Sequence, residues 1–229
     1  MNYIIGDIHA NIKELKSLLD IVKFKKDDRL IFIGDYIDKN VYTKETIELL
    51  LFLIKNYSCI LIKGNHDFVW DRYLNFQEFF RQDFLLTHGS VEALRQFSPE
   101  PEDLIKNNRT ELIRKYLRPY LALIPQMVDY YITDNYLATH AGLEKHQILQ
   151  RNLKFTEANY FLRGDKLDYD KKYLNKYTII AGHTHLGIKP LIREGYINID
   201  LGAGYGRYLG ALCVEKKIVI RSDNKIFKL

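Results

Sequence analysis

Two patterns of apolar and polar positions alternate in the first third of the chain. Short apolar runs, such as Tyr3–Ile5 and Leu30–Ile33, alternate with stretches whose apolar residues recur at helical spacing. Short runs of this kind are typical of buried strands, and the three-to-four spacing is typical of amphipathic helices. Asn11 and Thr43 precede the two helical stripes, and each can cap the helix that follows. The order strand, helix, strand, helix, strand predicts a parallel sheet with right-handed crossovers.

This alternation of strand-like and helix-like segments ends over residues 68–124, where helix-like stretches follow one another and predict a helical insertion. Aromatic residues recur in its first part, and we expect them to pack against a core because their spacing is helical: Phe68, Trp70, Tyr73, Phe76, Phe80 and Phe84. After Pro125 the strand pattern returns, and Lys216–Lys217 lie where a hairpin turn would join the last strand-like runs. The whole chain, 1–229, is therefore expected to form one α/β domain with this insertion.

Composition limits the classes of function. The chain has 229 residues, a net charge of +5 and no apolar stretch near the roughly 20 residues of a membrane span. Its lysines and arginines are dispersed, so we expect neither a nucleic-acid partner nor a membrane partner. The first residues lack the pattern of a signal peptide. Cys59 and Cys213 lie in strand-like runs, which favours reduced thiols in a cytoplasmic protein.

Polar residues gather where the predicted strands end. Five short blocks each closely follow an apolar run: Gly6–His9, Gly34–Asp38, Gly64–Asp67, Thr139–Gly142 and Gly182–His185. The carboxyl ends of strands are where open α/β sheets place their ligand sites. Carboxylate, imidazole and amide together form the ligand set of a hard-to-borderline divalent metal.

The ligand set suits two adjacent metal ions. The expected ligands of the first are Asp7, His9, Asp35 and the additional His185, and those of the second are Asp35, Asn65, His140 and His183. Asp35 would bridge the ions with its two oxygens, and a water between the ions would be acidified into a nucleophile. Taken singly, each block could be a turn or a cap, since Asp, Asn and Gly cluster in turns. The joint pattern favours the metal site, whereas His88 and His146 lie outside it and are interpreted as structural or surface residues.

The blocks resemble those of the phosphoprotein phosphatase family of the calcineurin-like metallophosphoesterases. That family carries Gly-Asp-x-His-Gly, Gly-Asp-x-x-Asp-Arg-Gly, Gly-Asn-His-Glu, a lone His and Gly-His, and its bacterial and phage branch is the most similar. The resemblance runs from Ile4 to about Cys213. It implies a four-layer αββα sandwich of two mixed β-sheets, with the site at one sheet edge.

The resemblance also implies roles for residues around the metals. Asp38 and His66 match the family's acid pair, in which His66 protonates the leaving oxygen and Asp38 holds it. Arg163 resembles the arginine that clamps substrate, Asn65 would contact substrate as well as metal, and Tyr205 resembles a tyrosine at the cleft rim. The glycines around Tyr205 do not predict a dinucleotide loop, because a strand-like run rather than a helix follows them.

The chain departs from the family pattern at several positions. Ala10 replaces a glycine, Asp67 replaces a glutamate, and His185 is additional. Lys39-Asn40 replaces Arg-Gly, so the planar fork that grips phosphate becomes a point charge. We expect Lys39 to bind substrate phosphate in its place.

Two functions are compatible with these residues. The first is a phosphomonoesterase acting on phosphoserine or phosphothreonine in proteins or peptides, and the second is hydrolysis of diadenosine tetraphosphate or related dinucleoside polyphosphates. Both would use two divalent ions, with Mn²⁺ expected and Fe, Zn or Ni as alternatives. A hypothesis of another class, motivated by Lys39, is a metal-bearing regulatory or binding protein with weak catalysis.

Overall fold

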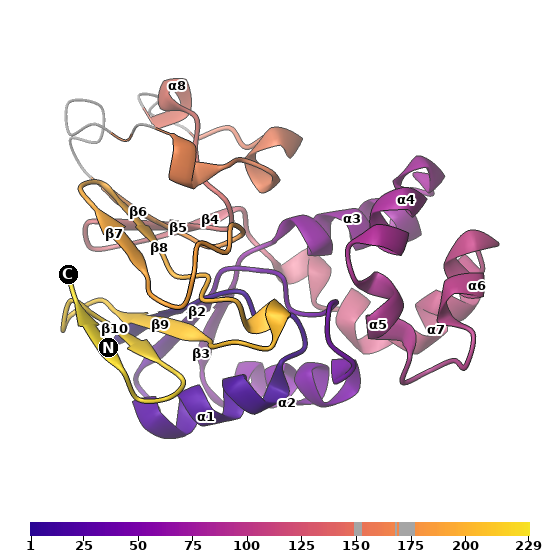
Figure 1. Ribbon diagram of the computed structural model, residues 1–229, viewed down its shortest axis with the longest axis horizontal. Helices are drawn as coiled ribbons and strands as arrows, with labels where there is room; N and C mark the ends of the chain where they lie inside the picture. Colours follow the sequence, from indigo (N-terminus) through magenta and orange to yellow (C-terminus); the bar gives the residue numbers. More distant parts are fainter. Residues whose placement is uncertain (149–152, 168, 170–176) are drawn as a thin grey trace.

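The computed structural model describes residues 1–148, 153–167, 169 and 177–229. The described strands form two mixed sheets that pack face to face (Figure 1). The first sheet has the order β11-β10-β9-β1-β2-β3, with bounds β1 Asn2–Ile5, β2 Arg29–Phe32, β3 Ser58–Leu61, β9 Gly210–Cys213, β10 Ile218–Arg221 and β11 Ile226–Lys228. The second has the order β4-β5-β6-β8-β7, with bounds β4 Tyr130–Thr133, β5 Tyr136–Thr139, β6 Thr178–Ala181, β7 Leu191–Arg193 and β8 Tyr196–Asn198.

Strand directions follow from the connections. β1, β2 and β3 are parallel, and helices α1 (Ile12–Val22) and α2 (Thr43–Asn56) connect them, as the sequence predicts. β9, β10 and β11 extend this sheet by antiparallel pairing, and Lys217 occupies the turn between β9 and β10 with a left-handed φ of 51°. In the second sheet, β5, β6 and β8 are parallel while β4 and β7 pair antiparallel at the edges. The parallel centres bring several strand ends to one edge of the sandwich.

The core consists of apolar layers on both faces of the sheets. Between the sheets lie the fully buried Ile4, Ile31 and Ile180. The outer face of the first sheet packs on α1 and α2, which contribute Leu15, Leu50 and others. Over the outer face of the second sheet lie α8 (Lys145–Ile148) and two 3₁₀ turns, η3 Glu157–Tyr160 and η4 Gly164–Lys166 (Figure 1). The expected fold of two mixed sheets flanked by helices is thereby confirmed.

The helical insertion packs beside the sandwich (Figure 1). It contains the helices α3 Asn65–Asn75, α4 Gln82–Thr87, α5 Ser90–Leu94, α6 Pro101–Lys106 and α7 Thr110–Leu121, and the turns η1 Phe79–Arg81 and η2 Ile124–Gln126. The helical segment begins at Asn65, three residues before the predicted start. In consequence, residues of the predicted metal site form the first turn of α3.

Two details differ from the predictions. Asn11 caps α1 as expected by accepting from the backbone of Glu14, but Thr43 does not cap α2. The helix already includes Thr43, whose buried hydroxyl has no hydrogen-bond partner among the described residues. The aromatic stripe is only partly buried: Phe76 and Phe80 are 58% and 75% exposed, with Arg72 and Arg81 stacked over their rings.

Both cysteines lie in strands of the first sheet. Cys59 is half-buried and Cys213 is buried, and neither forms a disulfide. In the described part of the chain, we find no helix with the length and apolar character required to span a bilayer.

Candidate metal centre and active site

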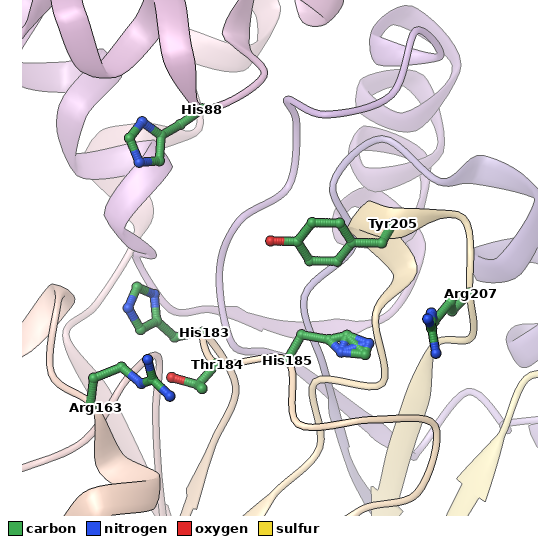
Figure 2. A pocket seen from close by; sticks show the side chains of 7 residues that line it. All are labelled: His88, Arg163, His183, Thr184, His185, Tyr205 and Arg207. Atoms are coloured by element: carbon green, nitrogen blue, oxygen red, sulfur yellow. The ribbon is translucent and has the colours of Figure 1, made fainter.

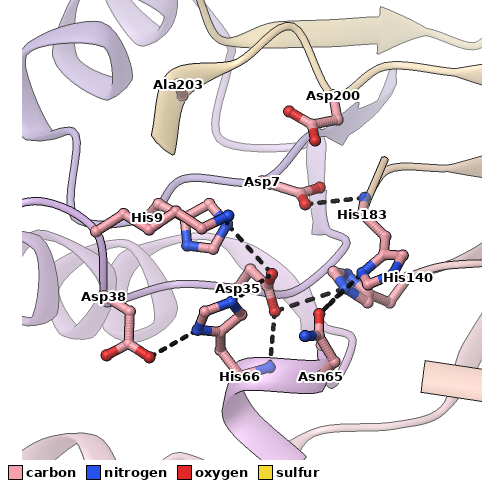
Figure 3. A network of polar contacts seen from close by, with 12 residues as sticks. Asp7, His9, Asp35, Asp38, Asn65, His66, His140, His183, Asp200 and Ala203 are labelled. Carbon is pink, nitrogen blue, oxygen red and sulfur yellow. Dashed lines mark hydrogen bonds and ion pairs between the residues drawn. The ribbon is translucent and has the colours of Figure 1, made fainter. Parts of the chain in front are cut away.

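Six of the seven predicted ligands converge at one edge of the sandwich (Figure 3). Asp7 and His9 follow β1, Asp35 follows β2, and Asn65 begins α3 just after β3. From the second sheet come the residues that follow β5 and β6, His140 and His183. Both sheets therefore contribute ligands, which explains why the polar blocks recur along the whole chain.

Local backbone geometry explains the glycines and the sharp turns of these blocks. His9, Asp35 and His183 have left-handed φ angles of 48°, 54° and 63°, which non-glycine residues rarely adopt and which concentrate at functional sites. A Cβ at Gly64 would lie 2.1 Å from Asp35 Oδ1, and one at Gly182 would lie 1.9 Å from Asp7 Oδ1. Only glycine permits these close approaches, so the glycine of each block lets two strand ends meet.

The two oxygens of Asp35 face two different groups of ligands. Oδ2 lies 3.2 Å from His9 Nε2 and 3.9 Å from His66 Nε2. Oδ1 lies 3.5 Å from His140 Nε2 and accepts from the backbone N–H of His66 at 3.1 Å. Metal-compatible groups occur on both sides, His9–Asp35–His66 and Asp7–Asp35–His140. The position of Asp35 is that of a carboxylate able to bridge two ions.

Hydrogen bonds at the far side of the imidazoles select their ligand atoms. His9 Nδ1 faces the carbonyl of Ile37 at 3.1 Å, and His140 Nδ1 faces the carbonyl of Ile33 at 2.8 Å. Each Nδ1 must therefore carry the proton, which leaves Nε2 as a lone-pair donor directed into the site. His140 Nε2 and His183 Nδ1 lie 2.8 and 3.0 Å from the same oxygen, Asn65 Oδ1. Such converging acceptors fit a cation.

The carboxylates of Asp7 and Asp35 provide a second test of whether these residues fit divalent ions. Asp7 is buried, and its Oδ1 has no hydrogen-bond partner among the described residues, which is costly unless a cation binds it. Burial, followed by the negative charges of Asp200 and Asp35, raises the pKa of Asp7 well above its usual range. Burial also acts to raise the pKa of Asp35, but the neighbouring histidines outweigh it and hold that pKa well below its usual value. The residues present thus fit two divalent ions.

His185 is placed differently from the other predicted ligands. It is half-buried and lies beside Gly202, where an added Cβ would come within 2.5 Å of its Nε2. Its ring meets Tyr205 edge-on at 5.4 Å. His183 contacts Asp7 and Asn65, whereas His185 has no such contact with another predicted ligand among the described residues. The structure therefore brings together six of the seven predicted ligands, and His185 lines the adjoining cavity.

The predicted acid pair is in hydrogen-bond contact. Asp38 Oδ2 lies 2.7 Å from His66 Nδ1 and also accepts from Ser90 Oγ at 2.6 Å, while Asp38 Oδ1 accepts from Trp70 Nε1 at 2.9 Å. Burial acts to lower the pKa of His66, but the charge of Asp35 and the hydrogen bond and charge of Asp38 raise it above its usual value. His66 Nε2 is left facing the metal side of the site.

The predicted substrate residues surround this centre. Lys39 Nζ lies 2.8 Å from His9 Nε2 and 4.9 Å from the ring centre of Tyr205. The lysine ammonium thus faces the same lone pair that a metal would use, so it must move aside when His9 binds an ion. Tyr205 is 65% exposed. Arg163 is exposed and forms a two-pronged ion pair with Asp165 at 3.0 and 3.2 Å.

Two adjoining cavities open beside the ligands. The first, of about 430 Å³, is lined by Asp35, Lys39, Asn65, His66, Thr87, His88, Gly89, His183, Gly204 and Tyr205. The second, of about 690 Å³, is lined by His88, Arg163, His183, Thr184, His185, Tyr205 and Arg207 (Figure 2). They share His88, His183 and Tyr205, so they adjoin and together form one cleft, whose second part is also lined by Arg163 and Arg207.

Two residues of the site were missed in the sequence analysis. Asp200 is buried next to Asp7, and its Oδ1 accepts from the backbone of Gly202 at 3.0 Å (Figure 3). Asp200 follows the end of β8, so the same strand-end rule that found the other ligands could have found it. His88 lines both cavities, although the sequence analysis left it as a structural or surface residue. Its position depends on the packing of the insertion, which leaves no local signal.

The fold and the paired ligand groups define a dinuclear metal-dependent hydrolase. The chain belongs to the calcineurin-like phosphoesterase family, whose model matches residues 3–216. It is a metallophosphoesterase, a family that binds two divalent metals, as the sequence predicts.

Two named relatives match most of this chain and share one name, and a third matches a shorter part. The chain is 28% identical over 234 residues to bis(5'-nucleosyl)-tetraphosphatase PrpE, asymmetrical type, of Geobacillus sp. (strain WCH70), covering 91% of this chain and 88% of that protein. It is 26% identical over 235 residues to the protein of the same name from Oceanobacillus iheyensis, covering 93% and 88%. A shorter match of 66 residues, 38% identical, joins 28% of this chain to 16% of the serine/threonine-protein phosphatase PP2A-like PPG1 of Candida albicans.

Solved structures with the same fold include a candidate diadenosine tetraphosphatase. It superposes with a TM-score of 0.64 at 20% identity, covering 96% of this chain and 91% of that one. A cold-active protein tyrosine phosphatase superposes with the same TM-score at 17% identity, covering 100% and 78%. At these identities the structural matches support the fold alone.

Proposed function

We propose that this metallophosphoesterase hydrolyses dinucleoside polyphosphates, with the two ions held by Asp7, His9, Asp35, Asn65, His140 and His183. The observation that carries the proposal is the cleft formed by the two adjoining cavities. The cavity at the metal ligands adjoins a second one that is lined by Arg163 and Arg207. A dinucleoside polyphosphate has a row of phosphates to occupy such a cleft, whereas a phosphoserine side chain has one. The names of the PrpE relatives, which span most of this chain, support the same substrate class.

The metal we propose is Mn²⁺, and the ion-binding residues are compatible with it. The proposed set contains oxygen and imidazole ligands and no thiolate, which suits hard-to-borderline divalent ions. When bound, such ions polarise the phosphoryl oxygens and acidify a water for attack on phosphorus. Asp35 keeps the two ions close, because its oxygens face opposite ligand groups.

The role proposed for His66 is that of general acid. Asp38 holds Nδ1 of His66, so Nε2 is the nitrogen that can deliver a proton to the leaving oxygen. The raised pKa of His66 favours the imidazolium that this role requires. Asp38 in turn is fixed by Trp70 and Ser90, which satisfy its remaining lone pairs and position it without reacting.

Three cationic side chains are proposed to bind the phosphates. Lys39 would contact the reacting phosphate once an ion occupies His9, because its Nζ already reaches the ligand shell. Arg163 and Arg207 would bind phosphates farther along the cleft, since guanidinium groups match phosphate oxygens in a two-pronged geometry. Tyr205 lines both cavities and so lies beside the proposed path of the phosphates.

A substrate panel tests the proposal. The manganese-loaded protein would be assayed on diadenosine tetraphosphate, a phosphoserine peptide and p-nitrophenyl phosphate, with products resolved by chromatography. We expect the highest kcat/KM for diadenosine tetraphosphate. A higher value for the phosphopeptide would assign the phosphoprotein function instead. Metal binding without turnover of any of the three would favour a regulatory or binding protein.

A further inference from the structure

His88 is the side chain of the insertion that reaches both parts of the cleft. It follows the last residue of α4 and lines the cavity at the metal ligands as well as the cavity with the two arginines. Figure 2 shows it entering the pocket from the insertion, while Tyr205 enters from the segment between β8 and β9. Two aromatic rings from separate elements therefore line the same cavity.

The residues that follow His88 are hydrogen-bonded to Asp38 and Lys39. The carbonyl of Gly89 accepts from the backbone N–H of Lys39 at 2.9 Å, and Ser90 Oγ donates to Asp38 at 2.6 Å. Gly89 has a left-handed φ of 92°, and an added Cβ would lie 2.8 Å from the Cα of Lys39. The corner between α4 and α5 thus rests directly against the residues that follow β2. His88 is held at a fixed distance from the acid pair although it belongs to the insertion.

The ring of His88 is itself ordered by stacking. It lies parallel to the ring of Phe84, with 4.2 Å between centroids and 2° between planes. Phe84 meets His66 edge-on at 5.1 Å. The imidazole of His88 is nevertheless exposed, because Phe84 covers only one face of it. A flat, preorganised aromatic surface is thereby presented beside the acid.

Hydrogen bonds at Nδ1 also hold the ring of His88 in place. Nδ1 lies 2.8 Å from Thr87 Oγ1 and 3.2 Å from the carbonyl of Phe84. Thr87 Oγ1 donates its own proton to the carbonyl of Asp83 at 2.6 Å, so it accepts from His88. Nδ1 therefore carries the hydrogen, and these contacts at Nδ1 help to hold the ring in its stacked orientation.

We infer that His88 is a nucleobase-binding residue, whose ring face opposite Phe84 stacks the base of the nucleotide next to the reacting phosphate. The inference rests on the proposed function and deepens it by assigning the part of the cleft, where the two cavities adjoin, that receives a base. Tyr205, which lines the same cavity, contributes the other aromatic wall. Stacking on aromatic side chains tolerates different bases, so the residue would select for a nucleotide without selecting strongly among bases.

The test compares two ligands that differ only in the base. Adenosine 5'-monophosphate and ribose 5-phosphate would be titrated calorimetrically into the full-length, manganese-loaded protein, and also tested as inhibitors of p-nitrophenyl phosphate hydrolysis. The wild type should bind the nucleotide more tightly. His88→Ala should weaken nucleotide binding by roughly 5- to 150-fold, the usual effect of losing one stacked base, and leave ribose 5-phosphate unchanged. His88→Phe should retain most of the affinity, since it keeps the flat ring.

A control variant and the pattern of losses separate the possible failures. His146→Ala, which alters an exposed histidine on α8, should leave both affinities unchanged. Unaltered nucleotide binding in His88→Ala, or equal losses for both ligands, would overturn the inference, and equal losses would indicate a phosphate contact instead. If the nucleotide preference depends on His88 while diadenosine tetraphosphate is not hydrolysed, the base site stands and the proposed substrate fails. If the wild type hydrolyses diadenosine tetraphosphate but His88→Ala binds the nucleotide as tightly as the wild type does, the proposed substrate stands and the base site fails.

Discussion

Tyr120, in the last turn of α7, donates a hydrogen bond of 2.5 Å to Oδ1 of the buried Asp67. The other oxygen of Asp67 accepts from the backbone N–H groups of Asp35 and Gly64, at 2.9 and 2.8 Å. One carboxylate thus joins the end of the insertion to two strand ends of the metal site. The family pattern has the longer glutamate at this position, and in this chain a tyrosine from α7 reaches the shorter aspartate.

Removing the Tyr120 hydroxyl tests that connection. Tyr120→Phe should lower the free energy of unfolding by about 1.5–3 kcal/mol, because a buried carboxylate loses a charge-assisted hydrogen bond. Urea unfolding of the metal-loaded protein measures the change. Tyr116→Phe, one turn earlier in the same helix, is the matched control and should have a smaller effect, since Tyr116 contacts Phe97 by ring stacking. Equal effects of the two variants would argue against a special role for the Asp67 contact.

Asp35→Asn should remove metal as well as activity, because it neutralises the carboxylate that faces both ligand groups. His140→Asn affects only one of those groups and should leave the other ion bound. Elemental analysis of the two purified variants distinguishes the shared ligand from the unshared one. Full occupancy of two ions in Asp35→Asn would exclude Asp35 as the bridge.

The leaving group decides how much His66 contributes. An alkyl oxygen must be protonated as it departs, whereas a nitrophenyl oxygen leaves readily as an anion. His66→Asn should therefore slow alkyl phosphates by about 10²–10⁴ and the nitrophenyl ester much less. Both substrates are measured on one preparation whose metal content matches the wild type. Equal losses would falsify the acid role and indicate that His66 binds ground-state phosphate.

Lys39→Ala should raise KM by about tenfold or more, the usual worth of a hydrogen bond from a charged donor, while the metals remain bound. The expectation follows from the position of Nζ, which reaches both His9 and the ring of Tyr205. Lys13→Ala removes an exposed lysine on α1 and controls for the change in net charge. An unchanged kcat/KM on every active substrate would leave Lys39 without a binding role.

Metal binding should stabilise the protein more at high pH than at low pH. Without a cation the raised pKa of Asp7 favours its protonated form, and the stability linked to that proton is lost as the pH rises through the raised value. A divalent ion replaces the proton, so its stabilising effect grows over the same range. Melting curves at about pH 5.5 and about pH 8, with and without MnCl₂, measure the difference. A smaller shift in melting temperature at the higher pH would contradict this linkage.

The ligands were predictable from the sequence because each lies within a few residues of a strand end. Asp7 and His183 are far apart in the chain, yet parallel strands bring both to one edge, where the backbone N–H of His183 donates to Asp7 at 2.9 Å. The limits of the prediction are equally physical. The support of Asp38 by Ser90 and Trp70 depends on how short helices pack, and no spacing rule encodes such contacts. Thr43 shows that a residue suited to capping can be drawn into the helix when its side chain is buried.

Most of the proposed metal ligands and part of the acid support come from different parts of the molecule. Asp7, His9, Asp35, His140 and His183 follow strands of the sandwich, whereas α3 and the α4–α5 corner hold Asp38 through Trp70 and Ser90. A change at the α4–α5 corner could therefore alter the support of Asp38 without moving those five ligands. A rearranged insertion would alter which leaving groups and which substrates are accepted, with the ions still in place. Proteins with the same two-ion site could therefore act on different substrates.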